Sequence, residues 1–288
     1  MKRLYLVLFL SFILLLTACG ASDSVFVFTE ENFPKMDGST ANIPLGQAVA
    51  AAMLGKSYDE CEDYVNFTKT SQAYFNFIDG KSDILLIYEP SEEVLAYKKE
   101  NNFEWEMAPI GRDGLVFLVN HINPVSDLSS DHLRKIYRGE ITDWQDIGGN
   151  QAEIMAFQRQ ENAGSQTLFK KLVLTHPLPP AKVMVIDEMS SLIQAVADYN
   201  NAESAIGYNV YYYVSMMRSN PNIKILSIDG VEANNQTIQT GEYPFVNDFY
   251  AVIRADEPAD SPARILFDFL QGETGKELIE KAGYVPVE

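Results

Sequence analysis

The residues best suited to chemistry lie in residues 157–169, which read FQRQENAGSQTLF. An apolar run precedes this stretch and apolar residues at helical spacing follow it, so its polar turn joins a predicted strand to a predicted helix. A helix leaves its first N–H groups without a partner, and its dipole adds partial positive charge there. Arg159 adds a planar fork of donors six residues before Ser165. These groups could bind an anion, although a capped surface helix with Ser165 as its N-cap explains the same pattern.

Two more strand-to-helix junctions carry hydroxyl groups. Gly38-Ser39-Thr40 precedes a predicted helix over 43–54, and Glu89-Pro90-Ser91 follows the apolar run 84–88. Strands that alternate with helices of ten to fifteen residues predict parallel α/β units. Ligands in such folds lie at the carboxyl ends of the strands. Three converging helix N-termini and one arginine therefore predict a small-oxyanion site that needs no metal and no cofactor.

A catalytic function finds little support in the sequence. His121, His132 and His176 lie in unrelated contexts, without the paired spacing of a metal site. The sequence also lacks a G-x-S-x-G elbow, a P-loop and a G-x-G-x-x-G turn after a strand. A secreted hydrolase would lack a nucleophile–base pair, so the pattern favours a binding protein that is not an enzyme.

Composition limits the partners. The 288 residues suffice for two domains, and the hydrophobic content of 47% is that of a globular protein. Forty acidic and 22 basic residues give a formal charge of −18. This charge argues against nucleic acid and against an anionic membrane face as electrostatic partners. An anionic ligand must therefore be held by local dipoles and one or two cations.

The first 18 residues predict a lipoprotein signal peptide. Lys2 and Arg3 precede an apolar stretch that is too short to span a bilayer. Leu16-Thr17-Ala18-Cys19-Gly20 resembles the bacterial lipobox, in which the cysteine is lipidated and becomes the mature N-terminus. The alternative is an ordinary cleaved signal with an incidental cysteine. Residues 19–24 are expected to form a tether, and lipidation of Cys19 would leave Cys61 without a disulfide partner.

The remaining elements are predicted from periodicity and turn residues. Strands are expected at 25–28, 64–67, 84–88, 116–120, 154–157, 183–186, 206–208 and 249–253. Helices are expected at 43–54, 72–80, 91–97, 129–138, 165–174, 190–198 and 263–270. Because no linker rich in Gly, Ser or Pro divides the chain, a two-lobed shape would have to arise through crossing strands.

Five motifs resemble the phosphate-binding lipoproteins of ABC importers. They are NPVSDLS from Asn123, IYRGEITDW from Ile136, R-x-E-x-A-G-S from Arg159, AIGY from Ala205 and GYVP from Gly283. The similarity runs from about Asp37 to Pro286, and the block around 139–144 is highly specific.

The resemblance implies an α/β fold of the type II periplasmic-binding-protein kind, in which two lobes joined by two crossing strands close on the ligand by a hinge. Lobe 1 would comprise 25–119 and 247–288, and lobe 2 would comprise 120–246. The DGST and EPSEE segments are similar to the Gram-positive branch, which implies a protein on the outer face of the cell membrane. Inorganic phosphate and ABC permease subunits would be its partners. The alternative is a sensor or adhesion lipoprotein of the same fold, or a receptor for another oxyanion or a small organic ligand.

The resemblance also implies a set of ligand contacts. Lobe 1 would contribute Ser39, Thr40, Glu89 and either Ser71 or its neighbour Thr70, and lobe 2 would contribute Arg159, Gly164 and Ser165. A carboxylate such as Glu89 can only accept a hydrogen bond, so it would favour protonated phosphate over fully ionised sulfate.

The chain departs from the family's pattern near this site. Ala163 replaces a serine and removes one donor, and Glu89 is one methylene longer than the usual aspartate. Asp37 and Glu161 add further carboxylates. We expect Glu161 to hold Arg159 in place and Asp37 to cap its helix.

Overall fold

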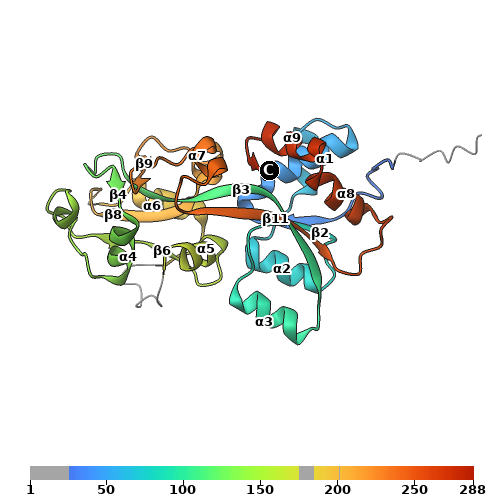
Figure 1. The fold of residues 1–288 in the computed structure, drawn as a ribbon, viewed down its shortest axis with the longest axis horizontal. Coiled ribbons are helices and arrows are strands. Elements are labelled where there is room, and N and C mark those ends of the chain that lie inside the picture. The colour runs from blue at the N-terminus through green and yellow to red at the C-terminus, as the bar shows by residue number, and fades with distance from the viewer. Residues whose placement is uncertain (1–25, 175–184, 201) are drawn as a thin grey trace, which may run out of the picture.

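Two long strands join the two lobes of the molecule (Figure 1). The computed structural model describes residues 26–174, 185–200 and 202–288. Strand β3 (Trp105–Asn120) pairs antiparallel with β11 (Val246–Arg254) up to Gly114, and from Leu115 it pairs with β8 (Ala205–Val210). Strand β3 therefore changes partner between Gly114 and Leu115 and belongs to both lobes. The boundary between lobes at 119/120 stays a prediction.

The first lobe is built on the strand order β1-β2-β11-β3, with helices on both faces (Figure 1). Strand β1 (Met36–Gly38) is parallel to β2 (Ile84–Ile87), and every residue of β2 is buried, as a strand covered on both faces requires. Leu85 and Ile87 pack with α2 and α3, whereas Ile84 and Leu86 belong to the main core. The other elements of this lobe are α1 (Ile43–Leu54), α2 (Thr70–Ile78), α3 (Glu92–Glu100), α8 (Pro262–Gln271), α9 (Glu273–Lys281) and β12 (Val285–Pro286).

The second lobe packs around β8, which lies between β3 and β5 (Met155–Ala156). Tyr208 of β8 stacks on Phe169 with 4.3 Å between ring centroids, and Phe117 and Tyr137 surround this pair. The other elements are β4 (Asp127–Leu128), α4 (Ser130–Arg138), β6 (Gln158–Arg159), α5 (Gly164–Leu172), β7 (Val185–Ile186), α6 (Met189–Ala197), β9 (Ile223–Ile225), β10 (Ser227–Ile228) and α7 (Asn235–Thr240).

Two predicted strands are wrong. Residues 26–28 and 65–67 form no strand, and Tyr64 ends the 3₁₀ helix Asp59–Tyr64. The apolar side chains in these segments pack on one another instead, because Phe33 meets Phe28 and Tyr64 edge to face. Tertiary packing therefore explains the hydrophobic residues that had suggested strands in these two segments.

Several predictions fall on residues that the structure leaves undescribed. The signal peptide, Cys19 and the tether lie outside the described residues, as do Val25, His176, Val183 and Met184. Within the described ranges, no helix has the length and apolar character needed to cross a membrane. The same ranges contain no group of three or more His, Cys, Asp or Glu side chains that could hold a metal ion.

Candidate anion-binding site

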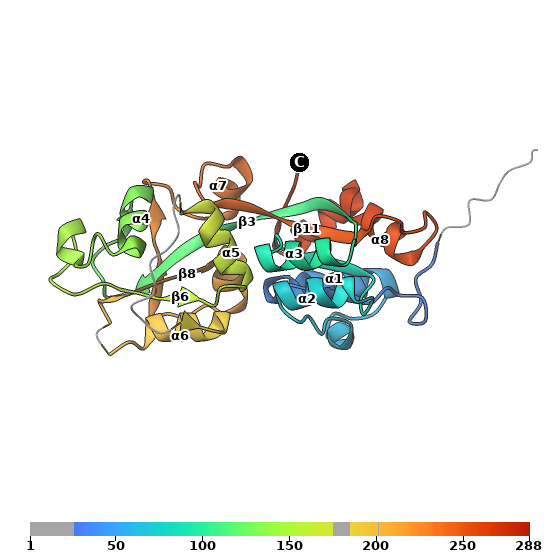
Figure 2. The same ribbon diagram turned by 90° about the horizontal axis from the view of Figure 1, so that it is seen from below.

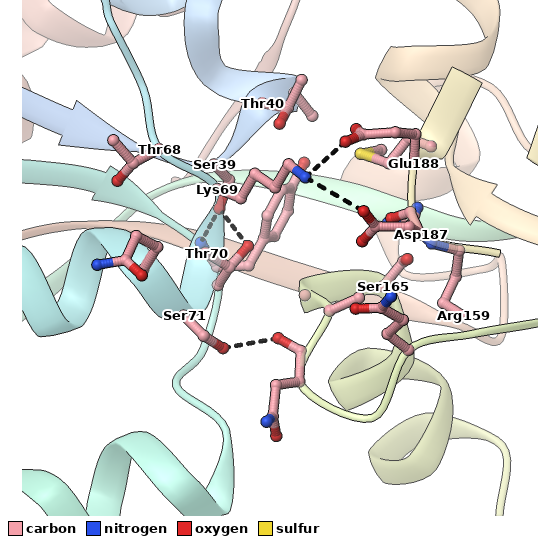
Figure 3. A pocket seen from close by; sticks show the side chains of 18 of the residues that line it. Ser39, Thr40, Thr68, Lys69, Thr70, Ser71, Arg159, Ser165, Asp187 and Glu188 are labelled. Carbon is pink, nitrogen blue, oxygen red and sulfur yellow. Dashed lines mark hydrogen bonds and ion pairs between the residues drawn. The ribbon is translucent and has the colours of Figure 1, made fainter. Parts of the chain in front are cut away.

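A cavity of about 530 Å³ lies between the two lobes (Figure 3). Figure 2 shows the start of α5 in the second lobe facing α2 and α3 of the first. The walls come from segments that follow strands: Ser39 after β1, Tyr88 after β2, Arg159 at the end of β6 and Asp187 after β7. The cavity thus lies at the carboxyl ends of strands, where α/β folds bind their ligands.

The second lobe presents the start of α5. Ala163 is the N-cap residue and has no hydroxyl group, so no side chain caps this helix. Ser165 is therefore not the N-cap, and the simple capped-helix interpretation is wrong. The Ser165 Oγ atom is buried and has no hydrogen-bond partner in the described part of the chain. The amides of Gly164 and Ser165 belong to the first turn, where the helix supplies no acceptor and its dipole is positive.

Arg159 provides the only buried guanidinium that lines this cavity among the described residues. Its Nε donates to the carbonyl of Ile186 at 3.0 Å, and its Nη2 donates to the carbonyl of Asp187. Its Nη1 is buried without a partner in the described residues. Burial lowers the pKa of Arg159 by desolvating its charged form. Two backbone carbonyls thus fix the side chain, and one charged donor remains for an anion.

The first lobe contributes hydroxyl groups. Ser39 Oγ lies 2.9 Å from Thr70 Oγ1, and the backbone N–H of Tyr88 donates to Ser39 Oγ at 3.3 Å. Thr40 and Ser71 line the same cavity. A hydroxyl can donate or accept, so this wall can match oxyanions in different protonation states.

Asp37 supports this wall from behind. Its carboxylate accepts hydrogen bonds from the backbone N–H groups of Gly38 and Thr68, each at 2.7 Å, and from the hydroxyl of Thr68. The prediction that Asp37 caps a helix is wrong. Asp37 joins the end of β1 to the segment that leads into α2, and it does not line the cavity.

The two lobes touch across the cavity. The Lys69 ammonium group reaches Glu188 at 2.6 Å and Asp187 at 3.9 Å (Figure 3). Ser71 Oγ donates to the carbonyl of Asn162 at 2.6 Å. A Cβ atom added to Gly164 would lie only 2.3 Å from Thr70 Oγ1. These contacts describe a closed arrangement.

Seven of the eight predicted ligand residues line this one cavity, and Glu89 does not. The seven are Ser39, Thr40, Thr70, Ser71, Arg159, Gly164 and Ser165. The Glu89 carboxylate instead pairs with Lys171 of α5 and accepts a hydrogen bond from the Tyr250 hydroxyl at 3.2 Å. Glu89 and Lys171 line a second pocket beside β11, which is separate from the cavity between the lobes.

Glu161 also has a different partner from the one expected. Its carboxylate pairs with Lys170 in the last turn of α5, whereas backbone carbonyls hold Arg159. The prediction that Glu161 positions Arg159 is therefore wrong.

Sequence reasoning missed Lys69, Asp187 and Glu188 as cavity residues. A usable signal existed for the last two, because they separate a predicted strand at 183–186 from a predicted helix at 190–198. Lys69 adopts a φ of +75°, which is uncommon for a residue with a side chain, and no sequence pattern announces it.

Comparison with known proteins agrees with this architecture. Residues 34–271 match the family model described as the PBP superfamily domain. The phosphate-binding protein PstS of Bacillus subtilis is 27% identical, with 99% of this chain and 94% of that protein covered. PstS of Staphylococcus haemolyticus is 25% identical, with 75% and 69% covered.

A solved structure, that of a putative phosphate ABC transporter substrate-binding protein with bound phosphate from Clostridium perfringens, superimposes with a TM-score of 0.69. The two sequences are 24% identical, and the match covers 88% of this chain and 98% of that one. An ABC-type phosphate transport receptor from Vibrio cholerae gives a TM-score of 0.63 at 21% identity, with 87% and 98% covered. The predicted α/β fold class is confirmed.

Proposed function

The chain belongs to the PBP superfamily, and on that premise we propose that it is an extracytoplasmic lipoprotein that captures inorganic phosphate between its lobes and delivers it to an ABC importer. Closure of lobe 1 (25–119 and 247–288) on lobe 2 (120–246) would trap the ion without chemical conversion. Cys19 would carry the lipid anchor on the outer face of the cell membrane, and the lipobox motif supports this part of the proposal.

One observation carries the proposal of an anion: two donors are buried at the cavity without partners. These are Arg159 Nη1 and Ser165 Oγ, which show no hydrogen bond within the described chain. Buried polar groups in native proteins are almost always paired, and an unpaired buried charge is costly. A tetrahedral oxyanion would satisfy both donors and the first amides of α5 together, and it would face the hydroxyls of Ser39, Thr40 and Thr70 on the opposite wall.

The relatives support phosphate as that oxyanion. The two PstS proteins are named phosphate-binding proteins, and the Clostridium perfringens structure contains phosphate. Three carboxylates line the cavity, those of Glu93, Asp187 and Glu188. Because carboxylates only accept hydrogen bonds, they disfavour a fully ionised anion such as sulfate and tolerate an anion that carries a proton. Discrimination between phosphate and sulfate therefore does not require the carboxylate of Glu89.

Isothermal titration with phosphate and sulfate tests the proposal. Native mass spectrometry first identifies any anion that copurifies with the protein, and unfolding with refolding by dialysis removes it. We expect one phosphate to bind per chain and sulfate to bind at least about a hundredfold more weakly, since the cavity carboxylates can only accept hydrogen bonds and fully ionised sulfate has no proton to donate to them. No heat with phosphate at millimolar concentration would contradict the proposal. A retained organic ion would instead support the alternative of a different small ligand.

A further inference from the structure

Asp113 is a buried carboxylate at the crossing between the lobes. It lies on β3, one residue before Gly114, where that strand exchanges β11 for β8. Only 2% of its surface is exposed, and no ion pair involves it among the described residues. A buried charge without a counter-ion is rare because desolvation opposes it.

Hydrogen-bond donors from both lobes hold the Asp113 carboxylate. The Tyr88 hydroxyl donates to Oδ2 at 2.7 Å, while the N–H groups of Gly114 and Tyr212 donate to Oδ1 at 2.7 Å and 3.1 Å. Tyr88 follows β2 of the first lobe, and Tyr212 follows β8 of the second. Asp113 therefore fixes the two strand ends relative to each other.

The contacts of Asp113 connect it to the anion cavity. Tyr88 and Val210 both line that cavity. The Tyr88 N–H donates to Ser39 Oγ, which in turn lies within hydrogen-bond distance of Thr70 Oγ1. The Asp113 carboxylate thus lies behind the wall that carries the first lobe's hydroxyl groups, and its charge opposes an anion in front of that wall.

The titratable groups that face Asp113 cannot neutralise it. They are the phenols of Tyr88, Tyr212 and Tyr284, whose pKa values burial raises, so all three remain neutral. Arg112, its neighbour on β3, instead pairs with Asp248 at 3.4 Å and donates to the carbonyl of Gln239.

Burial raises the pKa of Asp113 to about 6, while hydrogen bonds from the Tyr88 hydroxyl and from the backbone N–H groups of Tyr212, Gly114 and Tyr211 partly offset this rise. An anion in the cavity would raise it further, because it disfavours the charged form.

We propose that Asp113 is a positioning residue of the anion site, which fixes the Tyr88–Ser39–Thr70 wall and takes up a proton from solution when the anion binds. The proton adds to Oδ2, and the Tyr88 hydroxyl rotates from donor to acceptor, so the hydrogen bond between them is kept. No other bond changes. This inference rests on the proposed capture of phosphate.

Proton linkage measured by calorimetry tests the inference. Phosphate is titrated into the wild-type protein and into Asp113→Asn at pH 6.5, in two buffers with different ionisation enthalpies. Protons that phosphate itself exchanges cancel in the difference between the two proteins. One unit charge shifts a pKa by about one unit at a separation on the order of 10 Å and an effective dielectric constant of about 20. The wild type should then take up about half a proton more than the variant.

The pH dependence of affinity gives a second readout. Because the pKa of Asp113 is higher in the complex than in the free protein, protonation and binding reinforce each other. Between pH 7.5 and 5.5, phosphate affinity of the wild type should therefore rise by about fivefold more than that of Asp113→Asn. Asp248→Asn removes a partly exposed carboxylate from the neighbouring strand and should keep the wild-type proton uptake.

Tyr88→Phe keeps the inference testable if Asp113→Asn does not fold. Loss of the phenol donor destabilises the charged carboxylate, so Asp113 is already more protonated in the free protein and proton uptake should fall. If phosphate binds with equal proton uptake in the wild type and in each folded variant, the role of Asp113 is overturned and the proposed function is unaffected. Absence of phosphate binding by the wild type would instead overturn the proposed function.

Discussion

Replacing Arg159 with alanine should weaken phosphate binding about a thousandfold, because removing one partner of a buried ion pair costs about 3–5 kcal/mol. The guanidinium is held by the carbonyls of Ile186 and Asp187, so it is positioned before the anion arrives, and its Nη1 has no partner in the described residues. Isothermal titration of the variant measures the loss, and circular dichroism confirms that the fold persists.

Two further variants separate charge from geometry at Arg159. Arg159→Lys keeps a positive charge but loses the planar fork, so its affinity should fall between those of wild type and Arg159→Ala. Arg138→Ala is the matched control, because this arginine of the same lobe pairs with Glu140 at the surface, and its affinity should be unchanged. An Arg159→Ala protein that binds phosphate within tenfold of wild type would show that the anion lies elsewhere.

Gly164→Ala should weaken phosphate binding by about ten- to a hundredfold by preventing closure. The added Cβ would lie 2.3 Å from Thr70 Oγ1 of the opposite lobe, and overpacking of this kind costs about 1–3 kcal/mol. Alanine keeps the backbone N–H of residue 164, so the loss would report on closure rather than on a missing donor. Small-angle scattering should show that phosphate compacts the wild type and not the variant.

A double-mutant cycle isolates the contact between the lobes. Removing the Thr70 hydroxyl relieves the closest contact and leaves the Thr70 Cβ at 3.1 Å, a distance that a small shift can accommodate. Gly164→Ala should therefore cost less affinity in a Thr70→Ala background than in the wild type. Equal costs in both backgrounds, or full compaction of the single variant, would contradict closure through this contact.

Local patterns predicted most helices and the segments that form the cavity. Helix α1 spans the predicted residues 43–54, and α4 differs from its predicted range only at Ser129, which is its N-cap. The strand-to-helix junctions at Ser39 and Gly164 are encoded within a few residues, which explains why their convergence could be anticipated.

Partners distant in sequence explain what local patterns could not predict. Glu89 pairs with Lys171, which is 82 residues later, and so does not line the cavity. Arg159 is held by the carbonyl of Ile186, which is 27 residues later. Neither contact leaves a local signal. The part of β3 that pairs with β11 contains Pro109, Gly111 and Gly114 and does not have the sequence pattern of a strand. Its pairing with β11, which is far away in the chain, makes it one.

A crystal structure of the protein with phosphate tests the central claim most directly. We predict one phosphate between the lobes, with separate oxygens within hydrogen-bond distance of Arg159 Nη1 and Ser165 Oγ and with the hydroxyls of Ser39 and Thr70 opposite them. Phosphate bound elsewhere, or a cavity that stays without it at saturating concentration, would contradict the account.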